Sequence, residues 1–129
     1  MLRILIADDH HVVRKGLRQI LLDEFPTSVI EDVADAEELI KKVMHAQWDV
    51  VISDLSMPGR SGLDALQQIK LSYPELPVLI LSIHPEEQYA LRALKSGASG
   101  YLSKDTAPDE LVKAVKKVML GKKYISQAI

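Results

Sequence analysis

The chain has 129 residues, of which 47% are hydrophobic and 26% are charged, and its formal net charge at pH 7 is −2. This composition is typical of one globular domain with a substantial core, and it gives no sign of general affinity for nucleic acid or anionic membranes. The absence of cysteine excludes disulfide scaffolding, thiol catalysis and cysteine-ligated zinc. Because the apolar run over residues 1–7 is too short for a signal peptide or a membrane span, we expect a cytoplasmic protein without a membrane partner.

The N-terminal half alternates between short apolar runs and amphipathic stretches. The first apolar run ends at Asp8 and Asp9, and the acidic residues of the second run favour a sheet edge. Asp35 and Glu38 have the spacing of a capping pair at the start of a helix. The predicted elements are strands over residues 3–7, 29–33 and 49–53, and helices over residues 11–24 and from Asp35 onward.

The C-terminal half repeats this alternation. The run over residues 77–82 is fully apolar up to its serine, which is typical of a buried parallel strand. The strand over residues 99–103 is interrupted by a glycine, which favours a position at the sheet edge. Helices are predicted from after Gly62 to before Pro74, from about Pro85 to Gly97, and from near Pro108 to before Gly121.

Five successive strand-helix units predict a doubly wound parallel sheet with helices on both faces. The three apolar strands should be central, and right-handed crossovers favour a flavodoxin-like (βα)5 fold with five strands in the order 2-1-3-4-5. In that order the first and third strands are neighbours, and their carboxyl ends form the switch point where such sheets build their sites.

Chemically active side chains follow several of these strands. Asp8 and Asp9 follow the first strand, Asp54 the third and Lys104 the fifth, while Ser82 ends the fourth. Crowded carboxylates raise each other's pKa, and a hard divalent cation relieves the repulsion. A nucleophilic carboxylate, a cation and a lysine are the groups needed to transfer a phosphoryl group to an aspartate.

Together these motifs resemble the receiver domain of two-component response regulators over essentially the whole chain. The stretch over residues 81–105 resembles the NarL/FixJ (LuxR-type) subgroup, whose members usually carry a helix-turn-helix domain after the receiver. The resemblance therefore implies a receiver domain over residues 1–121 and, over residues 122–129, the start of a linker to a DNA-binding domain. The motifs that carry it are Asp8-Asp9, Asp54-Leu55-Ser56-Met57-Pro58-Gly59, Ser82, Tyr101 and Lys104.

The resemblance also implies the role of each site residue. Asp54 would accept the phosphoryl group from a phosphohistidine of a sensor histidine kinase. Asp9, Asp54 and the backbone carbonyl of Ser56 would ligate Mg²⁺, with Mn²⁺ as an alternative, and Asp8 would act through a bound water. Lys104 would pair with the phosphoryl oxygens. The domain would then be a self-phosphorylating and self-dephosphorylating switch and not a turnover enzyme.

The implied switch depends on Ser82 and Tyr101. Ser82 would hydrogen-bond the phosphoryl group, and Tyr101 would turn inward into the space that Ser82 leaves. The response would spread over the fourth helix, fifth strand and last helix, giving a phosphorylation-dependent homodimer. DNA would be bound only through the missing C-terminal domain.

The sequence departs from the family pattern at two positions. Ile83 stands where many receivers have a small residue, so access to Asp54 is expected to be restricted, and Ser56, Ile83 and His84 are candidates for tuning the reaction. Asp105 replaces a proline that often follows a cis bond, and we expect a trans bond because a cis bond without proline costs about 2.5–4 kcal/mol.

Each motif also has a plain structural interpretation. The aspartates could cap helices or turns, and Ser82, Tyr101 and Lys104 could be a strand-end hydroxyl, a packing ring and a surface lysine.

Competing functions are an aspartyl-phosphate hydrolase, a nucleotide-binding domain and an unphosphorylated pseudo-receiver that serves as an interaction module. The adjacent aspartates disfavour the hydrolase, and the lack of a glycine-rich turn after the first strand disfavours the nucleotide site. The histidines are interpreted as surface or rim residues: His10, His11, His45 and His84.

Overall fold

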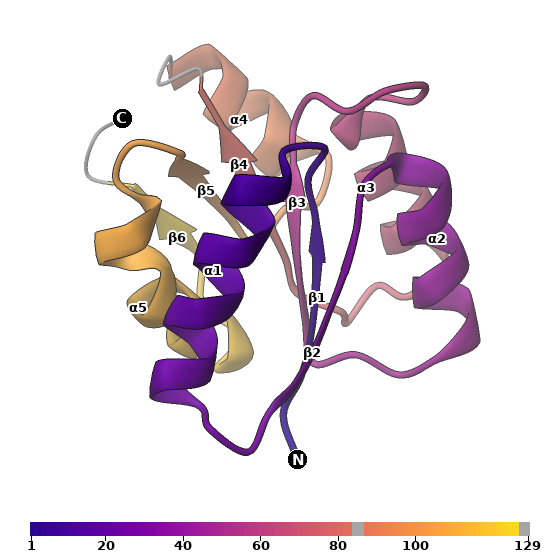
Figure 1. Cartoon of the computed structure of the whole chain (residues 1–129). Coiled ribbons are helices and arrows are strands. Elements are labelled where there is room, and N and C mark those ends of the chain that lie inside the picture. Colours follow the sequence, from indigo (N-terminus) through magenta and orange to yellow (C-terminus); the bar gives the residue numbers. More distant parts are fainter. Residues whose placement is uncertain (84–86, 127–129) are drawn as a thin grey trace.

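The computed structural model describes residues 1–83 and 87–126 (Figure 1). Within these residues, six parallel strands form one sheet in the order β2-β1-β3-β4-β5-β6. The strands are β1 (Arg3–Ala7), β2 (Val29–Val33), β3 (Val50–Asp54), β4 (Val78–Ser82), β5 (Gly100–Ser103) and β6 (Tyr124–Ile125). The helices are α1 (His11–Glu24), α2 (Ala36–His45), α3 (Gly62–Ser72), α4 (Glu87–Lys95) and α5 (Ala107–Met119).

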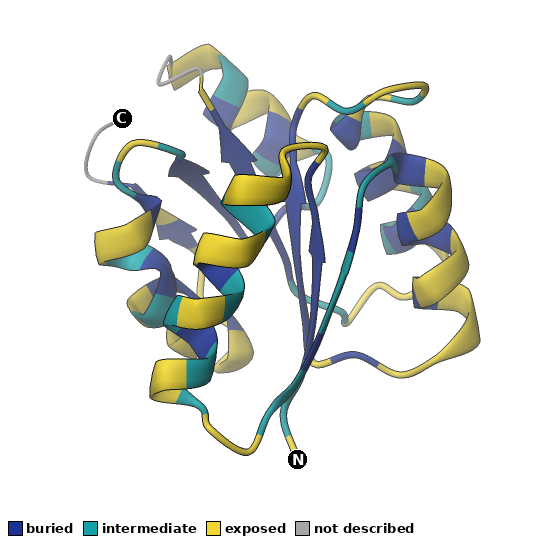
Figure 2. Cartoon of the chain, viewed as in Figure 1, coloured by how far each residue is buried: buried dark blue, intermediate teal, exposed yellow. Residues whose placement is uncertain are grey.

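Helices cover both faces of the sheet (Figure 1). Alternate strand residues point to opposite faces, so the same strands line two separate hydrophobic clusters. Helices α1 and α5 pack on one face, and α2, α3 and α4 pack on the other. The central strands β3 and β4 are buried along their whole length (Figure 2).

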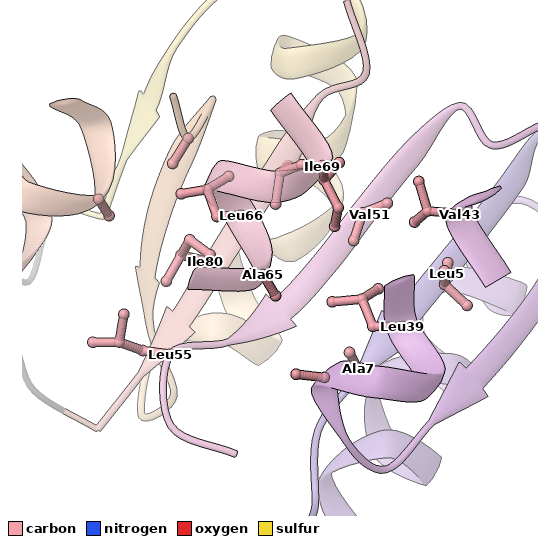
Figure 3. Close-up of a cluster of buried hydrophobic side chains, with 14 of the residues drawn as sticks. Leu5, Ala7, Leu39, Val43, Val51, Leu55, Ala65, Leu66, Ile69 and Ile80 are labelled. Carbon is pink, nitrogen blue, oxygen red and sulfur yellow. The ribbon is translucent and has the colours of Figure 1, made fainter. Parts of the chain in front are cut away.

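The cluster under α2 and α3 shows how the sequence pattern produces this packing (Figure 3). Leu5 and Val51 from the strands meet Leu39 from α2 and Leu66 from α3, and each of these side chains is at most 1% exposed. Burying a side chain of this size contributes about 1.5–3 kcal/mol. The expected capping pair of α2 is also present, since Asp35 Oδ1 accepts a hydrogen bond of 2.8 Å from the Glu38 backbone N–H.

The predicted doubly wound fold and the order 2-1-3-4-5 of the first five strands are confirmed, but the predicted strand count is wrong. The two-residue strand β6 pairs with β5, so β5 is not at the sheet edge as the sequence analysis expected. The glycine used in that argument has another reason. A Cβ atom at Gly100 would lie 2.5 Å from the Tyr124 carbonyl oxygen and 2.7 Å from Leu79 Cδ2, so glycine permits close approach of β6.

Glu110 on α5 helps to anchor β6. One of its carboxylate oxygens accepts a 2.6 Å hydrogen bond from the Tyr124 hydroxyl, and the other accepts a 2.7 Å bond from Ser126 Oγ. The Ser126 backbone N–H donates to the Tyr101 carbonyl at 2.9 Å. The start of the expected linker therefore includes a strand of the sheet, while the domain boundary at Gly121 stays a prediction.

Within residues 1–83 and 87–126, no helix combines the length and the apolar character needed to cross a membrane.

Candidate functional site

The site lies where neighbouring strands end. Parallel register aligns Ala7 of β1 with Ser53 of β3, so Asp8, directly after β1, lies beside Asp54, the last residue of β3. Lys104 follows β5, whose last residue is aligned with Ser82 of β4. The sequence predicted a strand ending at Ser53, whereas β3 extends one residue further and includes Asp54.

Lys104 links the two buried carboxylates. Its Nζ atom lies 2.9 Å from Asp8 Oδ2 and 3.1 Å from Asp54 Oδ2. The Lys104 side chain is 12% exposed, and those of Asp8 and Asp54 are 0% and 5% exposed. The partners of such an ion pair depend on each other, because removing one of them would leave a charge in the protein interior without compensation. The interpretation of Lys104 as an ordinary surface lysine is therefore wrong.

The charges of the three groups do not balance. Burial raises the pKa of the Asp54 carboxyl, the neighbouring Asp8 raises it further, and the contacts with Lys104 and the Ser56 N–H only partly oppose this. Burial lowers the pKa of Lys104, but its bonds to Asp8 and Asp54 outweigh that effect and the net shift is upward. One ammonium serves two buried carboxylates, so the site has room for more positive charge.

Asp9 and His10 complete the cluster at its exposed side. One potential ligand atom from each of Asp8, Asp9, His10 and Asp54 lies within 4.8 Å of all the others. His10 Nδ1 is 3.1 Å from Asp8 Oδ1 and 3.3 Å from Asp9 Oδ1. The sequence indicates only a rim residue at His10 and does not predict this proximity, because the side chain of an exposed residue after a strand can point either way.

Arg14 on α1 is a second group that the sequence analysis did not identify. Its Nη1 atom donates a 2.6 Å hydrogen bond to the Asp8 carbonyl, and its Nε atom lies 3.2 Å from Asp32 Oδ1 at the end of β2. Arg14 therefore holds the backbone after β1 against α1. Arg14 is the fourth residue of α1, and no pattern in the sequence distinguishes it from the other basic residues of this helix.

The loop after β3 positions Asp54 from the other side. The Ser56 backbone N–H donates to Asp54 Oδ1 at 3.3 Å, and the Gly62 N–H donates to the Leu55 carbonyl at 2.8 Å. A Cβ atom at Gly62 would overlap the Asp54 carbonyl oxygen. The glycine that begins α3 thus allows this helix to approach the end of β3 closely.

The predicted switch residues lie on neighbouring strands, since Ser82 ends β4 and Tyr101 belongs to β5. Ser82 is 1% exposed, and Tyr101 is completely buried among the side chains on the face covered by α3 and α4. The Tyr101 ring is therefore part of the hydrophobic core in this structure, and its role in a switch stays a prediction. Ile83 is 69% exposed at the rim, and His84 lies outside the described residues. The Lys104–Asp105 peptide bond is trans, as expected.

Comparisons with known proteins agree with this arrangement. The family model for the response regulator receiver domain matches residues 4–116. The chain belongs to this family. The receiver is 43% identical over 125 residues to the oxygen regulatory protein NreC of Staphylococcus carnosus (strain TM300), covering 96% of this chain and 58% of NreC. It is 37% identical to the response regulator UvrY of Escherichia coli (strain K12), covering 100% of this chain and 59% of UvrY.

Solved structures similar to this receiver also come from two-component response regulators. A LuxR-family two-component response regulator from Aurantimonas sp. SI85-9A1 superposes with a TM-score of 0.89 at 34% identity, covering 97% of this chain and 89% of that one. The isolated receiver domain of RcsB from Salmonella enterica serovar Typhimurium, in the presence of phosphomimetic BeF3−, gives a TM-score of 0.88 at 29% identity over 98% and 94% of the two chains. This receiver therefore belongs to the LuxR-type response regulators and spans about three fifths of the curated relatives.

Proposed function

We propose that this receiver accepts a phosphoryl group on Asp54 from the phosphohistidine of a sensor histidine kinase. The observation that carries the proposal is the contact of Lys104 with two buried carboxylates from different strands. Desolvation of the Asp54 carboxyl, which raises its pKa, is typical of a functional carboxylate, since a purely structural one is normally compensated.

In the proposed reaction, an Asp54 carboxylate oxygen attacks phosphorus, the phosphorus–nitrogen bond of the donor breaks, and its electrons stay on the imidazole. Lys104 already lies 3.1 Å from Asp54 Oδ2, so its ammonium is positioned to neutralise oxygens of the arriving group. The Ser56 N–H, at 3.3 Å from Asp54 Oδ1, orients the carboxylate.

The donor set at the end of β1 and β3 fits a divalent cation. Carboxylate oxygens of Asp8, Asp9 and Asp54 converge, and Lys104 alone does not compensate them. We propose that Asp9, Asp54 and the Ser56 carbonyl would hold Mg²⁺, with Asp8 acting through water. The ion would supply charge neutralisation at the transferred oxygens.

The proposed response passes through β4 and β5. A phosphoryl group adds strong acceptors, the Ser82 hydroxyl would hydrogen-bond it, and Tyr101 would turn inward into the space that Ser82 leaves. Moving a two-state equilibrium from 1:99 to 99:1 requires about 5.5 kcal/mol. A few charge-assisted hydrogen bonds of about 1.5–3 kcal/mol each are enough.

The proposed partners follow from the family. A histidine kinase would supply the phosphoryl group, and phosphorylation would favour a homodimer through the face formed by α4, β5 and α5. DNA binding would belong to a C-terminal domain, since the chain spans only 58% of NreC. We further propose a cytoplasmic location and a switch that dephosphorylates itself but does not turn over a separate substrate.

Mass spectrometry after incubation with acetyl phosphate and Mg²⁺ tests this function. We expect a gain of one phosphate in the wild-type protein and none in Asp54→Asn, whereas Asp23→Asn, at an exposed position on α1, should behave as wild type. Turnover of phosphoesters would instead indicate a hydrolase. If the protein gains no phosphate and binds no metal, the result would instead indicate a pseudo-receiver that acts only as an interaction module.

A further inference from the structure

His10 carries the one nitrogen ligand of the acidic cluster among the residues that the structure describes. Its Nδ1 atom lies 3.1 Å from Asp8 Oδ1, 3.3 Å from Asp9 Oδ1 and 3.4 Å from Lys104 Nζ. The Nδ1 edge of the ring therefore faces the carboxylates, while the side chain as a whole is 62% exposed.

The backbone fixes His10 in this place. It is the N-cap residue of α1, with extended dihedral angles of φ −96° and ψ 109°. Its backbone N–H donates a 2.8 Å hydrogen bond to Asp8 Oδ1, which closes a short turn between the strand and the helix. The imidazole thus returns to the same carboxylate that its own N–H contacts.

The distances suit a shared cation. In an octahedral site with metal–ligand bonds of about 2.1 Å, adjacent ligand atoms lie about 3.0 Å apart. The separations of His10 Nδ1 from the Asp8 and Asp9 oxygens are close to that value. The oxygen of Asp9, which is a proposed direct ligand, and the imidazole nitrogen of His10 therefore already have the mutual spacing of neighbouring ligands.

We propose that His10 Nδ1 is a direct ligand of the cation in this receiver and shifts its preference from Mg²⁺ towards Mn²⁺. This inference rests on the proposed metal-dependent function. Mg²⁺ takes oxygen ligands almost exclusively, whereas imidazole is a ligand of first-row transition ions. A site with a nitrogen ligand added to carboxylates therefore gains more for Mn²⁺ than for Mg²⁺.

His11 provides a matched control. It is the next residue, is also exposed, and begins α1, yet it is not a member of the cluster formed by Asp8, Asp9, His10 and Asp54. His10→Ala and His11→Ala remove the same side chain one position apart. Because both side chains are exposed, both variants should fold, which far-ultraviolet circular dichroism checks.

Electron spin echo spectroscopy of bound Mn²⁺ tests the ligation, with the metal alone as probe. We expect modulation from a directly coordinated nitrogen in the wild type and in His11→Ala, and its loss in His10→Ala. The ratio of Mn²⁺ to Mg²⁺ affinity, measured by competition, should fall about tenfold in His10→Ala only.

Bound Mn²⁺ without nitrogen modulation, or an unchanged affinity ratio in His10→Ala, would overturn this inference. Failure of Mn²⁺ to bind would overturn it too. Phosphate labelling with Mg²⁺ then separates the two claims, since labelling that persists leaves the proposed phosphoacceptor function intact.

Discussion

The Lys104 ammonium lies 3.1 Å from the Asp54 carboxylate, although 50 positions separate the two residues in the sequence. The strand order brings them together across β3, β4 and β5. The same ammonium also contacts Asp8, so two buried carboxylates depend on one partly buried ammonium. This dependence gives predictions that concern stability as well as phosphorylation.

Lys104→Gln should destabilise the fold by about 2–4 kcal/mol, because it leaves two buried carboxylates without their counter-charge. Urea unfolding at pH 7 measures this change. Lys113→Gln, at an exposed position on α5, should change the free energy of unfolding by less than about 0.5 kcal/mol. A similar small effect at Lys104 would mean that the ion pairs are not formed in solution.

Asp54→Asn should stabilise the folded protein at pH 7. Burial and the neighbouring Asp8 raise the pKa of the Asp54 carboxyl, so the native state holds its proton more tightly than the unfolded chain does. The native state thus gains stability below the unfolded value of 3.8, and this gain is lost as the pH rises through the folded pKa. The advantage of the variant should shrink as the pH falls towards that value. The free energies of unfolding of both proteins are measured at pH 7 and at pH 4. The same difference between Asp54→Asn and the wild type at both pH values would contradict this prediction.

The Tyr124 hydroxyl should titrate well above an ordinary tyrosine. Burial and the hydrogen bond to Glu110 raise the pKa of Tyr124 to about 12 from 10.0. The contribution of this hydroxyl to folding is complete below pH 10 and is lost as the pH rises towards 12. Ultraviolet absorbance of tyrosinate, with Tyr124→Phe to assign the signal, should show the pKa moving down in Glu110→Gln. No movement would place the Glu110 carboxylate away from this hydroxyl.

Two glycine-to-alanine variants should change stability in opposite directions. At Gly100 the new methyl group would lie 2.5 Å from the Tyr124 carbonyl oxygen, and we expect a loss of about 1–3 kcal/mol. At Gly16, inside α1, a Cβ meets nothing within 4 Å, and we expect a gain of about 0.5–1 kcal/mol. Hydrogen exchange of the Tyr124 and Ser126 amides should accelerate only in Gly100→Ala. Equal protection in both variants would show that β6 does not need the close approach.

Most of the fold was predictable because each central strand is a continuous apolar run between clear helix signals. The sixth strand was not, since Tyr124 and Ile125 form a pair too short for any periodicity. Its stability comes from Glu110 on α5 and from the backbone of β5, which are tertiary contacts. For the same reason, the sequence suggested that Gly100 weakens an edge strand, whereas in the structure Gly100 allows β6 to pack closely against β5.

The site was predictable to the extent that it depends on strand ends. Adjacent parallel strands bring Asp8 and Asp54 together, and the expected convergence of Asp9 and Lys104 on them is present. The direction of the His10 ring was not predictable, because an exposed residue after a strand can point either way. Its orientation follows from the turn closed by its backbone hydrogen bond to Asp8.

The most direct test of the account is to identify which carboxylate carries the phosphoryl group. Borohydride reduction of the acyl phosphate formed from acetyl phosphate and Mg²⁺, followed by peptide mapping, converts the modified aspartate into homoserine. We predict homoserine at position 54 alone. Homoserine at position 8 or 9, or none at any aspartate while phosphate is still incorporated, would contradict the assignment of Asp54 as the phosphoacceptor.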